Sequence, residues 1–152
     1  MPESDRFVLA SGFSLSGGTL GGEVIVQSFS GLEMNVEVSS NSVGNQAGGK
    51  KKLEPRPGPT TPGEPSFVCP IPRNDKKLAD WWKKLNPNAQ LGQYKTEDLM
   101  FTFQGDGGAV HAQWQLKGTF PMQYKVSDAE TNDSELACET IQLCVTEIER
   151  MV

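Results

Sequence analysis

Alternating apolar and polar side chains dominate this chain and predict a mainly β protein. The longest alternating segment spans residues 110–126, in which the apolar side chains keep one parity. These are Val110, Ala112, Trp114, Leu116, Phe120, Met122, Tyr124 and Val126. A period of two places them on one face of a strand and the intervening polar side chains on the other. Gly118 and Pro121 lie within the segment and predict a bend or bulge midway along it.

Shorter alternating segments lie on either side of this strand. In residues 32–38 the alternation predicts a strand with one buried face and one wet face. Its apolar side chains are Leu32, Met34, Val36 and Val38, and its polar ones are Glu33, Asn35 and Glu37. Residues 99–103 also alternate, and the glycine-rich turn 105–108 predicts a hairpin that joins them to the long strand. Residues 67–71 alternate but contain Pro70, which indicates a short or edge strand.

One segment has clear helical spacing. Apolar side chains recur at i, i+3, i+4 and i+7 from residue 78, and Asn74 or Asp75 can cap the start. We therefore predict a helix over 75–86 that packs on a sheet. Its expected core contacts are Leu78, Trp81, Trp82 and Leu85, with Trp114 contributed by the long strand. The tryptophan pair as a ligand platform is the alternative, but packing is the commoner role of such a stripe.

The end of the chain fits two patterns. Ile141, Leu143 and Val145 alternate with polar residues as in a strand, but Ile148 and Val152 extend a helical spacing from Val145. β-branched side chains are frequent in this segment, and they favour a strand.

Residues 39–65 predict a long irregular loop. The segment begins rich in Ser, Asn and Gly, continues with Lys50–Lys52 and ends rich in proline. A loop of this length inside a compact domain is usually functional or disordered. We expect it to become ordered against a partner.

The length and the charge of the chain narrow the set of possible functions. A chain of 152 residues is long enough for a single domain with its own core. The net charge of −5 argues against a general nucleic-acid binder. The charge is unevenly spread, because residues 50–84 carry +5 and the rest carries −10. This split suggests two complementary surfaces on one molecule.

Candidate catalytic and metal-binding groups are sparse. His111 is the single histidine and lies on the polar face of the long strand, without an obvious partner. The three cysteines show no CxxC spacing, so neither a zinc site nor a disulfide framework is expected. Residues 44–51 match GxxxxGK, but Lys51 replaces the Ser or Thr that would bind magnesium. We expect no enzyme, no metal and no cofactor.

Targeting signals are also not expected. The apolar run 7–10 is too short for a signal peptide, and no stretch approaches the roughly 18 apolar residues of a membrane span. We expect a cytosolic protein with reduced thiols.

Three motifs occur in an order that resembles a known family. One strand contains Ser30-Gly31-Leu32-Glu33, the long strand bends between Trp114 and Pro121, and the end reads E-x-x-x-E-T-I-x-L from Glu135 to Leu143. Over roughly residues 24–150 this order resembles the tail tube family of contractile-tailed phages. The inner tubes of contractile injection systems and of type VI secretion share that architecture.

The resemblance implies a fold and an assembly. The fold would be mainly β with one short helix, in two packed antiparallel sheets (a β-sandwich or barrel) that form one domain over residues 1–152. Six copies would close a ring in which the inner sheets join into a continuous β-barrel, and rings would stack into a tube. The family has no catalytic site and no cofactor.

The resemblance and the residue pattern together suggest two surfaces. A polar lumen would be lined by Glu33, Asn35, Glu37, Gln113 and Gln115, so that a cargo effector or DNA passes without specific binding. The loop 39–65 would be an inter-subunit arm that meets acids of the next protomer. The contacting bases would be Lys50, Lys51, Lys52 and Arg56.

We therefore expect a structural inner tube subunit that self-assembles in the cytoplasm as part of a phage tail or injection particle. Its expected partners are further copies of itself, a sheath protein, and baseplate and tube-terminating proteins. The runner-up is a tube-initiating or baseplate adaptor ring of the same machine. A third hypothesis is a monomeric β-barrel module that stacks a ligand on Trp81, Trp82 and Trp114.

Overall fold

The computed structural model describes residues 11–45, 51–85, 95–127 and 136–152. Within these residues the chain is mainly β with one short helix, as predicted. The elements in chain order are β1 (Gly12–Ser16), β2 (Val24–Val26), β3 (Ser28–Ser30), β4 (Met34–Asn45), β5 (Lys51–Pro62), β6 (Ser66–Pro70), α1 (Lys77–Leu85), β7 (Glu97–Gln104), a 3-10 turn (Asp106–Gly108), β8 (Val110–Val126), β9 (Cys138–Cys144) and β10 (Glu147–Arg150).

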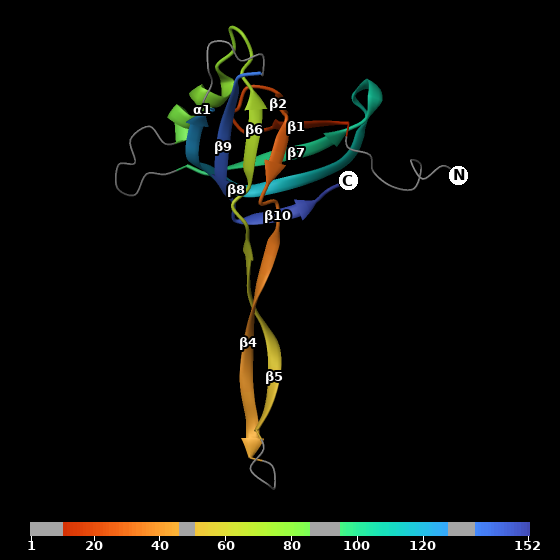
Figure 1. Cartoon of the computed structure of the whole chain (residues 1–152), viewed down its shortest axis with the longest axis vertical. Coiled ribbons are helices and arrows are strands. Elements are labelled where there is room, and N and C mark those ends of the chain that lie inside the picture. The colour runs from red at the N-terminus through yellow and green to blue at the C-terminus, as the bar shows by residue number, and fades with distance from the viewer. Residues whose placement is uncertain (1–10, 46–50, 86–94, 128–135) are drawn as a thin grey trace, which may run out of the picture.

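The body consists of two antiparallel layers that share β8 (Figure 1). The first half of β8 pairs with β7 and β10, and its second half pairs with β9. The first layer contains β2, β1, β7, the first half of β8 and β10, while the second contains the rest of β8, β9, β6 and β3. The expected pair of packed antiparallel sheets is confirmed. Among the described strands the path is open, with β2 at one end and β3 at the other.

The bend in β8 lies where the sequence predicts it. Gly118 has a φ of 59°, and the register against β9 shifts next to Pro121. The single parity expected for the whole strand is wrong beyond this bend. Thr119 and Pro121 are buried there, while Met122 is 42% exposed. A bend that inserts a residue into the pairing reverses which side chains face the core.

The core lies between the two layers. Phe101 of β7 contacts Phe29 of β3 and Phe67 of β6, with ring centroids 4.8 Å and 4.9 Å apart. Phe67 and Phe101 are fully buried. Aromatic contacts between the layers hold the two sheets face to face, each contributing about 0.5–1.5 kcal/mol beyond its buried area.

Helix α1 packs on this core as predicted. Leu78, Trp81 and Leu85 are buried, and Trp82 is half-buried against Tyr124 with ring centroids 6.4 Å apart. Trp114 also packs on the core, with its ring centroid 4.7 Å from that of Phe103. The helix begins at Lys77 rather than at residue 75, because the Asp75 carboxylate accepts the Lys77 N–H at 3.0 Å and so serves as the cap.

The end of the chain adopts the strand alternative. β9 pairs with both β6 and β8, and β10 pairs with the first half of β8. Ile141 and Leu143 are fully buried in the core, and Ile148 packs against it. Alternation and β-branching therefore indicated the correct structure.

Most of the described residues in 39–65, predicted as an irregular loop, belong to a regular β-hairpin that begins in the predicted strand 32–38. β4 and β5 pair with each other from Met34↔Pro62 to Asn45↔Lys51 and form a separate two-stranded sheet. We call this hairpin the arm, and Figure 1 shows it projecting from one end of the body. The prolines of β5 made this hairpin resemble a loop in the sequence. They are tolerated because β5 pairs with a strand on one side only within this chain.

The expectation of one buried face for residues 32–38 is wrong beyond its first residue. Leu32 packs against the core, but Met34, Val36 and Val38 are 41%, 47% and 69% exposed. The arm extends beyond the body, so no second layer formed by the described residues covers this apolar face.

Candidate assembly surfaces

A polar face covers the first layer on the side away from the core. Its side chains alternate with the buried residues of β1, β7 and β8, and most are hydroxyls and amides. They include Ser14, Thr102, Gln104, Gln113 and Gln115. The Gln104 amide donates to the Ser14 hydroxyl at 3.3 Å, and the Gln113 amide donates to the Thr102 hydroxyl at 3.1 Å. The face is therefore internally hydrogen-bonded.

Two of the five residues expected in the lumen share this face. Gln113 and Gln115 lie on the first half of β8, where they alternate with the buried Ala112 and Leu116. The other three belong elsewhere: Glu33 precedes β4, and Asn35 and Glu37 lie on β4 in the arm. All three are exposed. The structure therefore does not bring the five together on one sheet.

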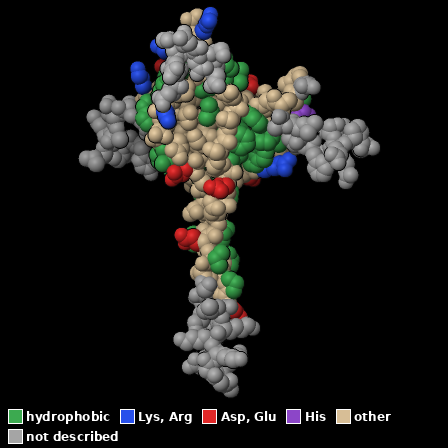
Figure 2. Space-filling view, in the orientation of Figure 1, with side chains coloured by type: hydrophobic (Ala, Val, Ile, Leu, Met, Phe, Trp, Pro, Cys, Tyr) green, Lys and Arg blue, Asp and Glu red, His purple; other side chains and the backbone are tan. Residues whose placement is uncertain are grey.

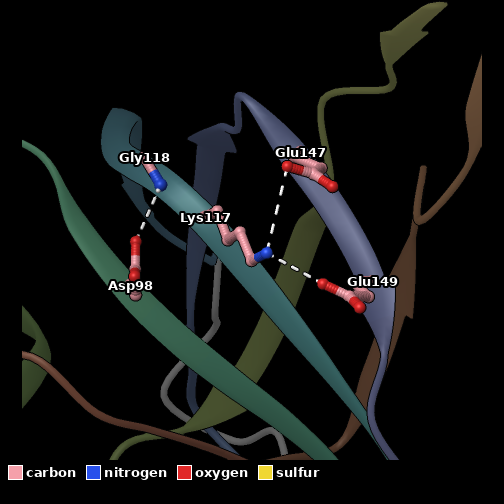
Figure 3. Close-up of polar contacts among 5 residues, drawn as sticks. All are labelled: Asp98, Lys117, Gly118, Glu147 and Glu149. Carbon is pink, nitrogen blue, oxygen red and sulfur yellow. Dashed lines mark hydrogen bonds and ion pairs between the residues drawn. The ribbon is translucent and has the colours of Figure 1, made fainter.

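Lys117 and four neighbours form a charged cluster at the edge of the polar face (Figure 3). Lys117 Nζ lies 2.8 Å from Glu149 Oε2 and 4.0 Å from Glu147 Oε2, both on β10. Asp98 on β7 accepts the Gly118 N–H at 3.0 Å. The hydrogen bond to Glu149 and the charge of Glu147 raise the pKa of Lys117. Because three carboxylates surround one amine, the cluster is acidic overall.

Sequence reasoning missed this cluster, although a signal for it exists. Glu147 and Glu149 flank Ile148 at the alternating positions of a strand, which places both acids on one face. Their partner Lys117 could not be inferred, because the pairing of β10 with β8 is a long-range contact.

A second polar cluster fastens the glycine-rich turn before β2 to the body. Glu97 accepts the Thr19 N–H and the Thr19 hydroxyl, both at 2.6 Å, and the Trp81 indole N–H at 3.2 Å. Lys84 donates to the Thr19 carbonyl at 3.3 Å. Partial burial acts to raise the pKa of Glu97, but the hydrogen bonds from Thr19 and Trp81 outweigh it, so the pKa is lowered.

Glu139 is a buried carboxylate next to a pocket. It is 6% exposed and accepts the Tyr124 hydroxyl at 2.5 Å. Burial and this hydrogen bond raise the pKa of Tyr124 to about 12. The neighbouring pocket has a volume of about 390 Å³ and lies between β2, the end of β6 and α1. Its apolar wall includes Val24, Ile25, Ile71 and Leu78.

Three of the four predicted contact bases lie on β5 of the arm. Lys51 and Lys52 begin β5, and Arg56 lies exposed in the middle of that strand opposite Ser39. The structure does not describe the side chains of Lys51 and Lys52, and Lys50 lies outside the described residues. Their contact with a neighbouring protomer stays a prediction.

His111 and the cysteine Cys69, which were considered as reactive groups, lie on different strands, β8 and β6. His111 is exposed on β8, and burial raises the pKa of the Cys69 thiol to about 12. Within the described ranges no three His, Cys, Asp or Glu side chains gather in a way that could hold a metal. The one helix found in the described part of the chain is too short to cross a membrane.

Comparisons with known proteins give a consistent match. Residues 13–149 match the model of the family described as T4-like virus tail tube protein gp19. No curated protein sequence matches the chain.

Solved structures share the fold at low sequence identity. A chain of the PVC sheath–tube complex, an extracellular contractile injection system in its extended state, is 18% identical with a TM-score of 0.74 over 92% of this chain and 88% of that one. A chain of the PVC sheath/tube terminator is 17% identical with a TM-score of 0.77 over 96% and 97%. Hcp1 from Flavobacterium johnsoniae is 15% identical with a TM-score of 0.54 over 91% and 93%.

Proposed function

This chain belongs to the family of T4-like virus tail tube proteins and is a structural tube subunit, and we propose that six copies close into rings that stack into a hollow inner tube. The tube would belong to a contractile injection system or a contractile phage tail. The observation that carries the proposal is the family match, which spans residues 13–149 and so includes both layers, the helix and the arm.

Open sheet edges support ring formation. Within the described chain, β10 pairs only with β8, and β2 pairs only with β1. Exposed edges are templates for pairing with another chain, and closure into a barrel removes them. We propose that the first layers of neighbouring copies join edge to edge around the ring.

The polar face of the first layer suits a channel wall. We propose that Gln113 and Gln115 face the lumen together with the hydroxyls and amides of β1 and β7. Gln113 is already hydrogen-bonded to Thr102 and Gln104 to Ser14, and the Lys117 cluster adds negative charge. Such a wall offers no strong site to a protein effector or to DNA, so cargo would pass without specific binding.

The arm suits contact between copies. Its apolar face, which consists of Met34, Val36 and Val38, is uncovered in one copy. We propose that this face becomes buried on another subunit, and that Lys50, Lys51, Lys52 and Arg56 meet acids of a neighbouring protomer. Because Arg56 is exposed on β5, added salt would weaken this charged part of the contact.

The similar structures suggest the wider assembly. They come from sheath–tube and tube-terminator complexes, so we propose sheath, baseplate and tube-terminating proteins as partners. We propose assembly in the cytoplasm, with any membrane association supplied by other components. The proposed role is mechanical and includes no catalytic step and no cofactor.

The test is electron microscopy of the concentrated purified protein at low and high salt. Extended hollow tubes built of six-fold rings are expected. Similarity to the tube terminator favours a second candidate, an adaptor ring at a tube end, which would form single rings but no tubes. Monodisperse monomer at every salt and concentration, with no rings in native lysate, would contradict both.

A further inference from the structure

The pocket beside Glu139 has the size and the lining of a small-molecule site. Its volume is about 390 Å³, and small-molecule sites commonly measure about 300–1,000 Å³. Val24 and Leu78 are buried at its wall, while Ile25 and Ile71 are exposed there. Sites of this kind combine a mainly apolar wall with a few polar groups that orient the ligand. The polar groups of this pocket therefore indicate which ligand it fits.

Acidic side chains outnumber basic ones in the pocket. Glu23, Asp75 and Glu139 line it together with Lys77. Lys77 is already paired with Asp75, with its Nζ atom 3.3 Å from Asp75 Oδ2. Glu23 accepts the neutral Gln104 amide at 2.8 Å, and neither Glu23 nor Glu139 has an ion-pair partner among the described residues. Two carboxylates therefore lie at an apolar pocket without a cation of their own.

Glu139 is the most deeply buried of these acids. It is 6% exposed, whereas Glu23 is exposed and Asp75 is half-buried. Its Oε2 atom accepts the Tyr124 hydroxyl, and no described residue donates to its Oε1 atom. Since no fully buried polar side-chain atom in the described chain lacks a partner, Oε1 opens to the pocket that Glu139 lines. A carboxylate in apolar surroundings is stabilised by an opposite charge, which a cation in the pocket would supply.

The three carboxylates come from different parts of the fold. Glu139 belongs to β9, Glu23 precedes β2 and Asp75 precedes α1. Within the described ranges, no three acidic, histidine or cysteine side chains lie close enough together to hold a metal ion. The pocket therefore suits an organic cation, because a hydrocarbon chain can separate two charges and cover the apolar wall.

Most lysines near α1 line a different hollow. Figure 2 shows several Lys and Arg side chains at the end of the body where α1 lies. Lys76 and Lys84 line a second hollow, which shares Asp75 and Lys77 with the apolar pocket. Lys84 donates to the Thr19 carbonyl at 3.3 Å. A cation in the apolar pocket would thus meet Lys77 alone, and Asp75 offsets the charge of that lysine.

We propose that this pocket binds a short aliphatic diamine. One ammonium group pairs with Glu139 and donates to its Oε1 atom. The hydrocarbon chain lies against Val24, Ile71 and Leu78. The second ammonium group pairs with Glu23 at the rim. The two positive charges match the lining, in which three carboxylates and one lysine leave an excess of two negative charges. The bound diamine would join β2, α1 and β9, and this role goes beyond that of a tube subunit.

Calorimetric titration of the full chain at low protein concentration tests the ligand class. The probes are putrescine, cadaverine and hexamethylenediamine, all at equal ionic strength so that general screening is the same. At least one of them should bind with one site per chain and raise the melting temperature. Hexylamine, which lacks the second ammonium group, should bind about fivefold more weakly than hexamethylenediamine. Hexanediol, which has no charge, should not bind.

Two substitutions test the assigned contacts. Glu139→Gln keeps the shape of the side chain but removes its charge, and it should weaken both hexamethylenediamine and hexylamine by at least about tenfold. Glu23→Gln should weaken hexamethylenediamine by about fivefold and leave hexylamine unchanged, because only the diamine reaches the rim. Glu64→Gln is the matched control, since Glu64 is exposed and lines neither hollow. Thermal melts check that each variant folds, and Glu23→Gln together with the probe series decides if Glu139→Gln does not.

The outcomes separate this inference from the proposed function. No binding of any of the three diamines would overturn the inference. Equal losses in Glu23→Gln and Glu64→Gln would also overturn it, because they would indicate attraction to the overall negative charge rather than to this pocket. Wild-type protein that forms tubes but binds no diamine contradicts the inference alone. Protein that binds a diamine but forms neither rings nor tubes contradicts the proposed function alone.

Discussion

At the scale of single residues, Glu97 joins three parts of the chain that are distant in sequence. Its carboxylate binds Thr19 in the glycine-rich turn and Trp81 in the helix, while its own backbone belongs to β7. Hydrogen bonds to a charged group contribute more than neutral ones, about 1.5–3 kcal/mol each. The turn before β2 is therefore fixed by a side chain that sequence reasoning did not single out.

We expect Glu97→Gln to lower the free energy of unfolding by roughly 1–2 kcal/mol, because the replacement keeps the shape but removes the charge. The pKa of Glu97 is lowered from its ordinary value of 4.5, so its stabilisation is fully present above that value. It is lost as the pH falls through the lowered pKa. Urea unfolding between pH 7 and pH 3 should show the difference between wild type and variant shrinking in acid. The exposed Glu64→Gln is the control, and a difference that grows in acid would contradict this assignment.

Gly118 allows the bend in β8. Its φ of 59° disfavours any side chain, and an added Cβ would lie 2.5 Å from the Thr146 hydroxyl oxygen. Gly118→Ala should therefore reduce stability by about 1–3 kcal/mol. Gly107→Ala provides the comparison, since its φ is 77° but nothing lies within 4 Å of the added atom. Thermal melts should rank Gly118→Ala clearly below Gly107→Ala; equal melting temperatures would show that the contact with Thr146 is unimportant.

At the scale of elements, periodicity predicted those parts of the fold that pack on the core. Helix α1, the β7–β8 hairpin and the terminal strands have buried faces, and burial imposes a repeating pattern on the sequence. The parity of β8 was wrong beyond Gly118, because the position of a bulge depends on pairing with β9. The arm beyond Val38 was taken for a loop because its segment is rich in Ser, Asn and Gly and its prolines resemble loop residues.

The candidate surfaces were predictable to a smaller extent. The alternation around Gln113 and Gln115 correctly indicated a polar face on β8. The same reasoning placed Glu33, Asn35 and Glu37 with them, because alternation identifies a face but not the sheet to which a strand belongs. The pocket beside Glu139 combines β2, β6, α1 and β9, and no local sequence pattern predicts such a combination.

The packing of helix α1 on the body is expected to depend on Trp81, which is fully buried and hydrogen-bonded. Trp81→Ala should destabilise the protein by about 3–5 kcal/mol, because it leaves a large cavity and removes a donor to Glu97. Trp82→Ala should have a smaller effect, since Trp82 is only half-buried. Chemical denaturation of both variants checks the order. A larger loss for Trp82→Ala would mean that the helix packs through its other face.

The arm should contribute little to the stability of the body. Val38 is 69% exposed, so Val38→Ser should change the free energy of unfolding by no more than about 0.5 kcal/mol. The same substitution should impair assembly, because it removes an apolar side chain from the contact face. Denaturation and sedimentation of one preparation test both statements. A strongly destabilised monomer would show that the arm packs on its own body.

At the scale of the whole molecule, the charge distribution fits directional self-assembly. The net charge of −5 conceals exposed acids on the arm and at its root, and lysines around a hollow beside α1. The sequence suggested complementary surfaces, with the positive charge in residues 50–84 and the contact bases at Lys50, Lys51, Lys52 and Arg56. Both contributions are compatible with stacked copies, because the arm carries acids at its root and bases toward its far end.

The most direct measurement is a cryo-electron microscopy reconstruction of the particles that form when the purified protein is concentrated. The account predicts hollow tubes with six subunits per ring, the Gln113 face toward the channel and each arm in contact with another subunit. A protein that stays monomeric at every concentration and salt, or that forms solid filaments without a channel, would contradict it.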